Sequence, residues 1–417
     1  MSMQIISDQD NSAGMNRITV LLGALIILFF TSCDIKKNKD VKPETFLKIY
    51  DHSDITSEYI PYDIQQTADE GFLILGGRKV SESPFKGVYV MKTDKDGNFV
   101  SEQNVSSDYV NPVNQLVKVG NQIFFFCMDR LSLEAKLMKI DETGIATEVA
   151  GLGLLYPLYA SLNGDNNSLT LLSYNREDKR TVVSRISTGG TILNQKSFDI
   201  GFGDFDAEQA IIEHLSGQGK HLPFFCGQLN NNTYYFNAFY RYTLSLVFFD
   251  MLSTDRNPRV GLVQGYQDER VISSLVFKGN GFAISRFAYG DNFFIPNVTL
   301  NYAPNAVSSS SDIPGNKMFE LKPDANVVLK NCALNNGNAL VYGSDTKSGQ
   351  IALYFYDVNS GMLLGNKYLG SMNPYTLAGY TVANDKSLVV AGTTWIAGRF
   401  PRICIFKVSK EELEEAM

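Results

Sequence analysis

The sequence predicts an all-β protein built from a four-stranded unit that is repeated along the chain. Its 417 residues include 27 Phe, 21 Tyr and 34 Gly but one Trp. This mixture is typical of aromatic strands joined by tight turns. Hydrophobic residues make up 44% and charged residues 19%, so the chain can bury a core and is not disordered as a whole. Strand-like apolar runs return about every 50 residues, which indicates a repeat architecture.

The charge and the histidine content argue against several classes of function. The net charge is −7 and the pI about 5.2, whereas a nucleic-acid-binding protein needs a basic face that neutralises phosphates. The chain has three His and contains no GxSxG or HExxH motif and no CxxC pair. We therefore expect no metal, no cofactor, no nucleic acid and no catalytic residue, and predict that the protein is not an enzyme.

The N-terminal segment has the pattern of an export signal. Arg17 supplies a positive charge, and Val20–Phe30 is an apolar stretch of 11 residues, too short to span ~30 Å of hydrocarbon as a helix. Thr31, Ser32 and Cys33 follow it. This segment resembles the lipobox of bacterial lipoproteins, in the loose form found in Bacteroidota. The resemblance implies diacylation of the Cys33 sulfur, cleavage before Cys33, and N-acylation of the new terminus, which together give a stable membrane anchor.

Residues 1–32 are therefore predicted to be a signal peptide, which starts either at Met15 or with a longer n-region before it. Residues 33–44 would be the lipidated Cys33 and a flexible tether without apolar periodicity. We expect anchoring at the bacterial outer membrane. Surface lipoproteins of Bacteroidota often carry an acidic cluster after the Cys, but lysines dominate here, so the periplasmic and the surface-facing side both stay open. The tether lysines are Lys36, Lys37, Lys39 and Lys42.

The body of the chain begins with a unit that shows four strand-like runs, residues 62–104. Tyr62–Thr67 and Phe72–Leu75 are separated by a turn, and Val88–Thr93 leads into a second turn at Asp94–Asn98. Such a succession predicts an antiparallel meander. The four cysteines of the body are expected to be buried free thiols on strands. They are Cys127, Cys226, Cys332 and Cys404.

Six further units follow, and a small residue ends the second strand in most of them. In the fourth unit, His221–Phe225 is expected to be the second strand and Thr233–Tyr240 the third. Four strands in about 50 residues are typical of a β-propeller blade. The first unit, TADEGFLILGG…VYVMKTDKDGN, also resembles the "DGGYILAG…LIKTDxxGN" repeats of Bacteroidota propeller proteins, a resemblance that implies architecture and no catalytic residues. The second strands end at Gly76, Cys127, Ser173, Cys226, Arg286, Gly343 and Gly392.

Residues 45–410 are predicted to form a seven-bladed β-propeller of four-stranded antiparallel blades. The seventh unit stops after Arg402–Val408 without a fourth strand, while Thr45–Tyr50 is a spare strand-like run before the first unit. We predict that this N-terminal strand completes the last blade and so removes an exposed sheet edge. Residues 411–417 are predicted to be an acidic C-terminal tail. The alternative is that residues 45–50 are extended tether and residues 411–417 a frayed helix.

Two short motifs are similar to ligand loops but are better explained as turns. Asp94–Asn98 has the Asp and Gly content of a calcium loop, yet its Gly97 stands at the wrong position of that pattern. Gly217–Lys220 is similar to part of a phosphate loop, but His214 and His221 occupy places where that motif needs Gly and Ser or Thr. We expect a hairpin turn at both places.

The candidate binding face is formed by the loops between second and third strands. Arg and aromatic residues, which are frequent in binding hot spots, gather in these loops. We expect a non-catalytic protein-binding or scaffolding module with an envelope protein partner, recognised through an acidic segment or an anionic glycan. The alternative is a surface lipoprotein that binds or processes glycans, for which no carboxylate pair is evident. The candidate residues are Arg78, Arg130, Tyr174, Arg176, Arg286, Tyr289, Trp395 and Arg399.

Overall fold

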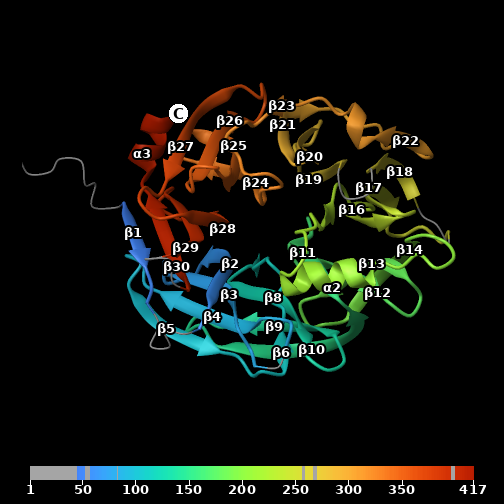
Figure 1. The fold of residues 1–417 in the computed structure, drawn as a ribbon, viewed down its shortest axis with the longest axis horizontal. Helices are drawn as coiled ribbons and strands as arrows, with labels where there is room; N and C mark the ends of the chain where they lie inside the picture. Colours follow the sequence, from blue (N-terminus) through green and yellow to red (C-terminus); the bar gives the residue numbers. More distant parts are fainter. Residues whose placement is uncertain (1–44, 52–56, 82, 256–258, 266–269, 396–399) are drawn as a thin grey trace, which may run out of the picture. The chain divides into compact units, whose positions relative to one another are not determined.

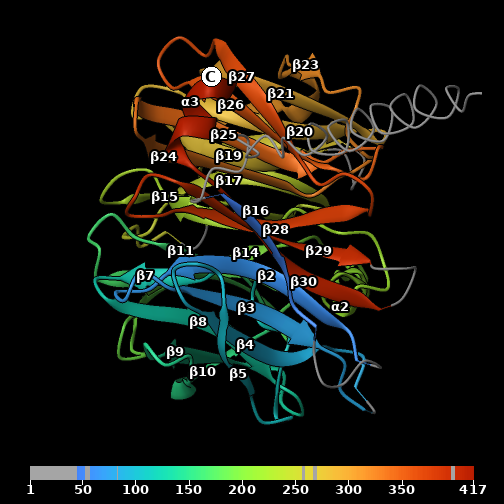
Figure 2. The same ribbon diagram turned by 90° about the vertical axis from the view of Figure 1, so that its left-hand side faces the viewer.

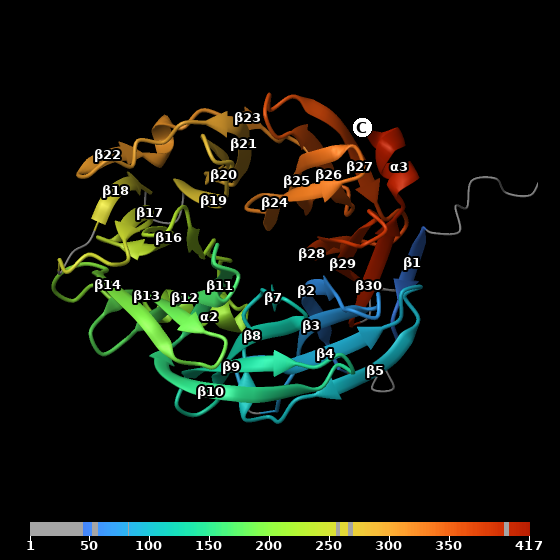
Figure 3. The same ribbon diagram turned by 180° about the vertical axis from the view of Figure 1, so that it is seen from behind.

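Strands account for nearly all the regular structure of this chain. The computed structural model describes residues 45–51, 57–81, 83–255, 259–265, 270–395 and 400–417, which all belong to one compact unit, Glu44–Met417. The predicted signal peptide, Cys33 and the predicted tether lie outside the described residues. The described strands form an all-β fold of several antiparallel sheets, and Figures 1 and 3 show these sheets placed around a common centre.

The first two repeat units form one nine-stranded sheet. Two four-stranded meanders are joined by the short strand β6 (Tyr109–Val110), which pairs with a strand of each meander. The first meander contains β2 (Tyr59–Gln66), β3 (Phe72–Arg78), β4 (Gly87–Thr93) and β5 (Phe99–Asn104). The second contains β7 (Val117–Val119), β8 (Gln122–Asp129), β9 (Glu134–Ile140) and β10 (Ala146–Leu155).

Four separate sheets follow along the chain. The second of these sheets gains a fifth strand, because β22 (Ala306–Ser309) pairs with β18 in parallel. The first sheet contains β11 (Pro157–Leu162), β12 (Ser168–Asn175), β13 (Arg180–Ser187) and β14 (Ile192–Asp199). The second contains β15 (Phe225–Gln228), β16 (Thr233–Tyr240), β17 (Thr243–Asp250) and β18 (Arg259–Gln264). The third contains β19 (Arg270–Phe277), β20 (Phe282–Ala288), β21 (Asp291–Val298) and β23 (Asn316–Lys317). The fourth contains β24 (Val327–Leu334), β25 (Gly337–Asp345), β26 (Ile351–Asp357) and β27 (Leu363–Leu369).

The last sheet joins the first described strand to the end of the chain. It contains β28 (Tyr375–Val382), β29 (Leu388–Trp395) and β30 (Pro401–Val408), and its outer strand is β1 (Phe46–Ile49). β1 pairs antiparallel with β30, so that Phe46 faces Lys407 and Ile49 faces Cys404. The predicted pairing of the N-terminal strand with Arg402–Val408 is thus confirmed.

The helices are few, and two of them differ from the sequence-based expectation. α2 (Glu208–Ser216) stands between β14 and β15 and ends at Gly217, whose φ of 70° is a left-handed helix stop. The Gly217–Lys220 segment therefore follows a helix and does not form the expected hairpin. α3 (Lys410–Ala416) replaces the expected tail. The Ser409 side chain caps α3, and its Leu413 is buried. A 3₁₀ turn, η1, spans Ser310–Asp312.

The fourth unit is shifted by one strand relative to the prediction. β15 begins at Phe225 and is the first strand of its sheet, and Thr233–Tyr240 is the second. The run of Pro, Phe and Cys before residue 227 has the apolar content of a second strand. The extra residues of α2, which the repeat pattern does not contain, hid the true first strand.

Alternation along each strand builds the core between neighbouring sheets. On β8, Phe124 and Phe126 pack against the following sheet, whereas Phe125 and Cys127 pack against β3 and β4. Strands that are buried on both faces read as continuous apolar runs, as β8 does. The four body cysteines are buried and free, as predicted. In the part of the chain that the structure describes, no helix is long and apolar enough to cross a membrane.

Each four-stranded unit presents two ends, which we name for their connections. The turn face carries the turns between first and second strands and between third and fourth strands. The loop face carries the connections between second and third strands and between units. In Figure 2, α2 lies at the right-hand ends of the sheets, and this is the loop face.

Candidate functional site

The first strands of successive units line a central cavity of about 160 Å³. Asp63 comes from β2, Tyr159 from β11, Ser273 from β19, Lys330 from β24 and Gly379 from β28. Because one such strand from nearly every unit reaches the cavity, the sheets are arranged radially around it. This combination of four-stranded antiparallel sheets and a central cavity defines the β-propeller fold.

Asp63 ties three units together at the wall of the cavity. Its Oδ2 accepts a hydrogen bond from the backbone N–H of Leu116 at 2.9 Å, and Lys330 Nζ lies 3.7 Å from its Oδ1. A Cβ at Gly379 would lie 2.5 Å from the same Oδ1, so only glycine leaves room for the carboxylate. Burial raises the pKa of Asp63, while Lys330 and the Leu116 hydrogen bond oppose the rise. Asp63 is therefore first of all a structural link.

Two imidazoles stand at the wall of the cavity beside α2. The rings of His214 and His221 are 4.9 Å apart, and His214 Nδ1 accepts a hydrogen bond from the backbone N–H of Leu222 at 2.9 Å. His214 also packs edge-on against Phe224. Burial, with the neighbouring imidazole second, lowers the pKa of His214 to about 3. Desolvation by the surrounding protein also lowers the pKa of His221, although its side chain is exposed. Both imidazoles are thus neutral at pH 7.

This histidine pair was missed at the sequence level. Its two members flank Gly217–Lys220 and were interpreted as the reason to reject a phosphate loop. The usable signal was helical spacing, since Ala207, Ile211 and Leu215 follow one another at intervals of four before the glycine stop. The described residues hold no group of three or more His, Cys, Asp or Glu side chains that could bind a metal ion.

The predicted binding residues that the structure describes lie at or just after the loop-face ends of second strands, but their surroundings differ. Tyr174 is buried, and its hydroxyl donates to Asp206 Oδ1 at 2.8 Å. Arg176 lies 3.8 Å from Glu208 Oε1 of α2. Tyr174 and Arg176 are therefore in contact with α2 and with Asp206, which lies just before the helix. The Nε atoms of Arg78 and Arg130 are buried with no hydrogen-bond partner among the described residues.

The remaining predicted residues lie in two places. Arg286 on β20 and Tyr289 directly after it belong to the same sheet edge, and Tyr289 is 59% exposed. Trp395 is half-buried at the end of β29, where it pairs with Pro401. Arg399 lies outside the described residues. The structure adds Arg270, which begins β19 and stacks over the Tyr289 ring at 4.5 Å. Sequence reasoning missed Arg270 because it begins a first strand and does not lie in a second-to-third-strand loop.

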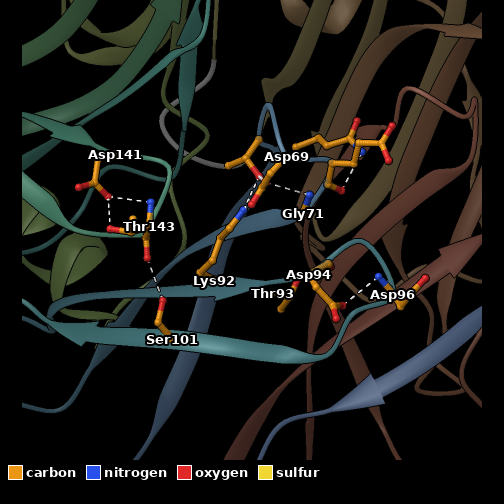
Figure 4. Close-up of polar contacts among 12 residues, drawn as sticks. Asp69, Gly71, Lys92, Thr93, Asp94, Asp96, Ser101, Asp141 and Thr143 are labelled. Carbon is orange, nitrogen blue, oxygen red and sulfur yellow. Dashed lines mark hydrogen bonds and ion pairs between the residues drawn. The ribbon is translucent and has the colours of Figure 1, made fainter.

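On the turn face, charged groups are satisfied locally (Figure 4). Lys92 is buried and donates to Asp69 Oδ1 at 2.6 Å and to the Thr67 hydroxyl. Asp94 Oδ1 accepts the backbone N–H groups of Asp96 at 2.9 Å and Asn98 at 2.7 Å. These Asx-type bonds confirm the turn interpretation over a calcium loop. Lys92 is thus part of the repeat structure.

A second hollow, of about 280 Å³, lies on the turn face between the β11–β12 turn and the β15–β16 turn. Its carboxylate, Asp165, accepts from Arg185 at 2.6 Å and from the Ser168 hydroxyl at 2.8 Å. Desolvation raises the pKa of Asp165, but backbone and side-chain hydrogen bonds outweigh it and lower the pKa to about 2. The ionisable groups of this hollow are therefore already paired.

The sequence matches no protein-family model and no curated protein. Among solved structures, the chain is similar to the β-propeller domain of the Trilobed protease from Pyrococcus furiosus, with 9% identity over 85% of this chain and 98% of that chain and a TM-score of 0.46. It is similar to a periplasmic gluconolactonase of Pseudomonas aeruginosa at 11% identity, over 85% and 97% of the two chains, with a TM-score of 0.46. It is also similar to the acylaminoacyl peptidase of Pyrococcus horikoshii at 12% identity, over 82% of this chain and 52% of that one, with a TM-score of 0.43.

The expectation that the chain is not an enzyme needs correction. The solved structures similar to it include chains titled gluconolactonase and acylaminoacyl peptidase, so this architecture does not exclude an enzyme. Missing sequence motifs were an insufficient reason, because the side chains at the central cavity come from strands that are far apart in the sequence. At these identities the similarity concerns the fold and assigns no reaction to this chain.

Proposed function

We propose that this chain is a lipid-anchored β-propeller of the bacterial outer membrane that binds an envelope protein at its loop face. The observation that carries the proposal is a group of loop-face arginines that pairs with no described carboxylate. Charged groups elsewhere on both faces are paired, as Asp69 is with Lys92 and Arg176 with Glu208, whereas Arg270 and Arg286 stack on the rings of Tyr289 and Phe293. Arginine and tyrosine side chains held in place are typical of binding hot spots.

The partner is tested by cross-linking in native envelopes, followed by reconstitution with the purified partner. We expect the double substitution of Arg286→Ala with Tyr289→Ala to abolish binding of the identified partner, while Lys95→Ala on the turn face leaves it unchanged. Equal binding by both variants would refute the loop-face assignment. Loss caused by Lys95→Ala alone would place the interface on the turn face.

For the architecture, we propose seven blades closed by β1. Six four-stranded meanders, counted with the nine-stranded sheet divided at β6, and the sheet of β28, β29, β30 and β1 support this count. Bonds between the first and last sheets support closure, since Gln66 Oε1 accepts the backbone N–H of Asn384 at 2.8 Å. Deleting residues 45–50 should lower the melting temperature by several degrees, since ~1 kcal/mol shifts a large domain by ~2–4 °C. Deleting residues 34–43 should not, and equal effects would refute closure by β1.

The membrane anchor is proposed at Cys33, from the sequence before it. We expect Cys33→Ala to move the protein from the membrane to the soluble fraction or to leave its signal peptide uncleaved. A parent-like fractionation and mobility of the Cys33→Ala protein would refute the anchor. Protease accessibility on intact cells then distinguishes the surface-facing from the periplasmic side.

We propose hydrolysis of a small ester or lactone in the central cavity as a second candidate function. It is favoured by His221, a neutral and accessible imidazole beside His214, which has the protonation state of a general base at pH 7. A glycan-cleaving carboxylate pair is not favoured, because Asp63 is the one carboxylate residue lining the cavity among the described residues. Turnover of a lactone and aryl-ester panel, lost in His221→Gln and retained in Lys95→Ala, would support hydrolysis. Equal rates in both variants would refute it.

A further inference from the structure

Arg270 and Arg286 lie on the same face of one sheet. In the antiparallel pairing of β19 with β20, Arg270 faces Ala288 and Ile272 faces Arg286. The two arginines are therefore diagonal neighbours, with Cα atoms roughly 7–8 Å apart. That separation lets both guanidinium groups reach the two oxygens of one carboxylate or its immediate neighbour.

Each guanidinium is held by a ring and by a hydrogen bond. Arg286 stacks over Phe293 at 4.3 Å, and its Nε donates to the Ile313 carbonyl at 2.9 Å. Arg270 stacks over Tyr289 at 4.5 Å, and its Nη1 donates to the Ser311 hydroxyl at 3.1 Å. Stacking and one bond each fix the side chains but leave further N–H groups of each fork for a ligand.

The turn that carries Tyr289 adopts an unfavourable backbone conformation. Tyr289 has φ 51° and Gly290 φ 84°, which is the two-residue hairpin turn between β20 and β21. Glycine or asparagine normally occupies both positions, and a left-handed tyrosine is disfavoured by roughly 1–2 kcal/mol. The chain accepts this strain at the point where the ring covers Arg270.

The pair is not neutralised by the described residues. No carboxylate among them forms an ion pair with Arg270 or Arg286. Asp291 pairs with Lys317 at 2.6 Å, Asp324 lies 3.8 Å from Lys220, and Asp312 precedes the carbonyl that Arg286 binds. Burial first and the neighbouring Arg270 second lower the pKa of Arg286.

We propose that Arg270 and Arg286 form a binding site for a carboxylate of an acidic segment in the partner protein. The inference rests on the proposed loop-face function and names the group that is recognised. A carboxylate would receive two charge-assisted bonds from the paired forks, and Tyr289, 59% exposed, would cover the adjoining peptide. On a chain of net charge −7, such a site selects an acidic segment against a general electrostatic repulsion.

The test measures binding of a defined peptide by the purified full chain. A ten-residue peptide with two adjacent Glu is titrated calorimetrically at low and physiological salt, beside the same peptide with Gln. We expect the Glu peptide to bind and the Gln peptide to lose at least tenfold in affinity. Arg270→Ala and Arg286→Ala should each weaken the Glu peptide roughly tenfold or more, as expected for charge-assisted hydrogen bonds.

Matched variants keep the result interpretable. Arg176→Ala removes an arginine of the same face whose charge is already paired with Glu208, and it should not change binding. Asp312→Asn removes an acidic residue of η1 that directly precedes the Ile313 carbonyl bound by Arg286, and it should strengthen binding. Arg286→Lys keeps the charge without the fork and should bind more weakly than the parent, which covers the case in which Arg286→Ala does not fold.

Three outcomes would overturn the proposal: equal binding of the Glu and Gln peptides, full affinity in both arginine variants, or tight binding of an oligouronate with none of the peptide. The last would assign the site to an anionic glycan. Failure of the partner test in envelopes with intact peptide binding would instead refute the envelope partner and leave the carboxylate site standing.

Discussion

The turn face and the loop face differ in one group of charged side chains. At the turn face, Asp69 pairs with Lys92, Asp165 with Arg185 and Asp385 with Lys407, each at 2.6 Å. In each pair, an Asp in the turn between the first two strands meets a cation on the third strand 20 to 23 residues later. At the loop face, Arg176 is likewise paired with Glu208, but Arg270 and Arg286 stack on aromatic rings and pair with no described carboxylate.

This difference teaches how a repeat separates structure from recognition. The turn-face pairs recur in units of different sequence because each one closes a local turn onto its own sheet. Their carboxylates accept backbone N–H groups as well, and the pKa values of Asp69 and Asp385 are lowered as a result, although burial alone would raise them. The loop face contains what does not recur, namely α2, the histidine pair and the arginine pair. Residues that recur are structural here, and residues that break the pattern are the candidates for binding.

The largest expected effect concerns Asp345. This buried carboxylate forms no ion pair with a described cation, unlike the turn-face carboxylates Asp69 and Asp165. Leu377 N–H donates to its Oδ1 at 2.7 Å, but burial raises its pKa to about 6. An unfolded Asp has a pKa of about 3.9. Between these values the folded state binds more protons than the unfolded state, so stability is fully present below about pH 4 and falls as the pH rises to about 6.

The Asp345→Asn variant should remove this loss. Two pKa units at about 1.4 kcal/mol each correspond to about 3 kcal/mol. Urea unfolding at pH 4.5 and pH 7.5 should show a smaller difference for Asp345→Asn than for the parent. Asp94→Asn on the turn face should leave this difference nearly unchanged, because the lowered pKa of Asp94 places its effect on stability below about pH 4. Parallel pH profiles for parent and Asp345→Asn would contradict the assignment.

A second comparison sets a buried turn-face lysine beside an exposed one. Lys92→Met removes two charge-assisted bonds from a buried site and leaves Asp69 without its cation, so we expect a loss of about 2 kcal/mol. Lys95→Met, in the adjacent turn, changes an exposed side chain and should stay within about 0.5 kcal/mol. Denaturant midpoints of the two variants give the comparison. Similar midpoints would show that the turn-face pairs contribute little to the repeat.

The smallest effect is expected where the loop face holds α2. Tyr174→Phe removes one hydroxyl hydrogen bond to Asp206 and should lower stability by about 1 kcal/mol. Hydrogen exchange should increase in residues 207–216 more than in β12 itself, since the lost bond holds Asp206, the residue just before this segment. Uniform exchange across both segments would argue that α2 is held by its apolar side chains alone.

Much of the fold followed from local pattern. The turn residues of the first unit and the spare strand at Thr45–Tyr50 are local features of the chain, and they were enough to predict the meanders and the pairing of β1 with β30. The fourth unit was misassigned because α2 interrupts the period. The tail was misassigned because Leu413, its one buried apolar side chain, gives no visible periodicity in seven residues.

The sequence by itself determined the all-β class, the repeat and its spacing, and the four free buried cysteines. It also named Arg286 and Tyr289 at the loop face. The tertiary structure decided which side chains meet: His214 with His221, Asp63 with Lys330, and Arg270 with Arg286. The physical reason is the distance along the sequence over which each kind of interaction acts. Turn chemistry and strand alternation act over a few residues and are visible in the sequence, whereas a cavity lined by strands from many units depends on pairings dozens to hundreds of residues apart.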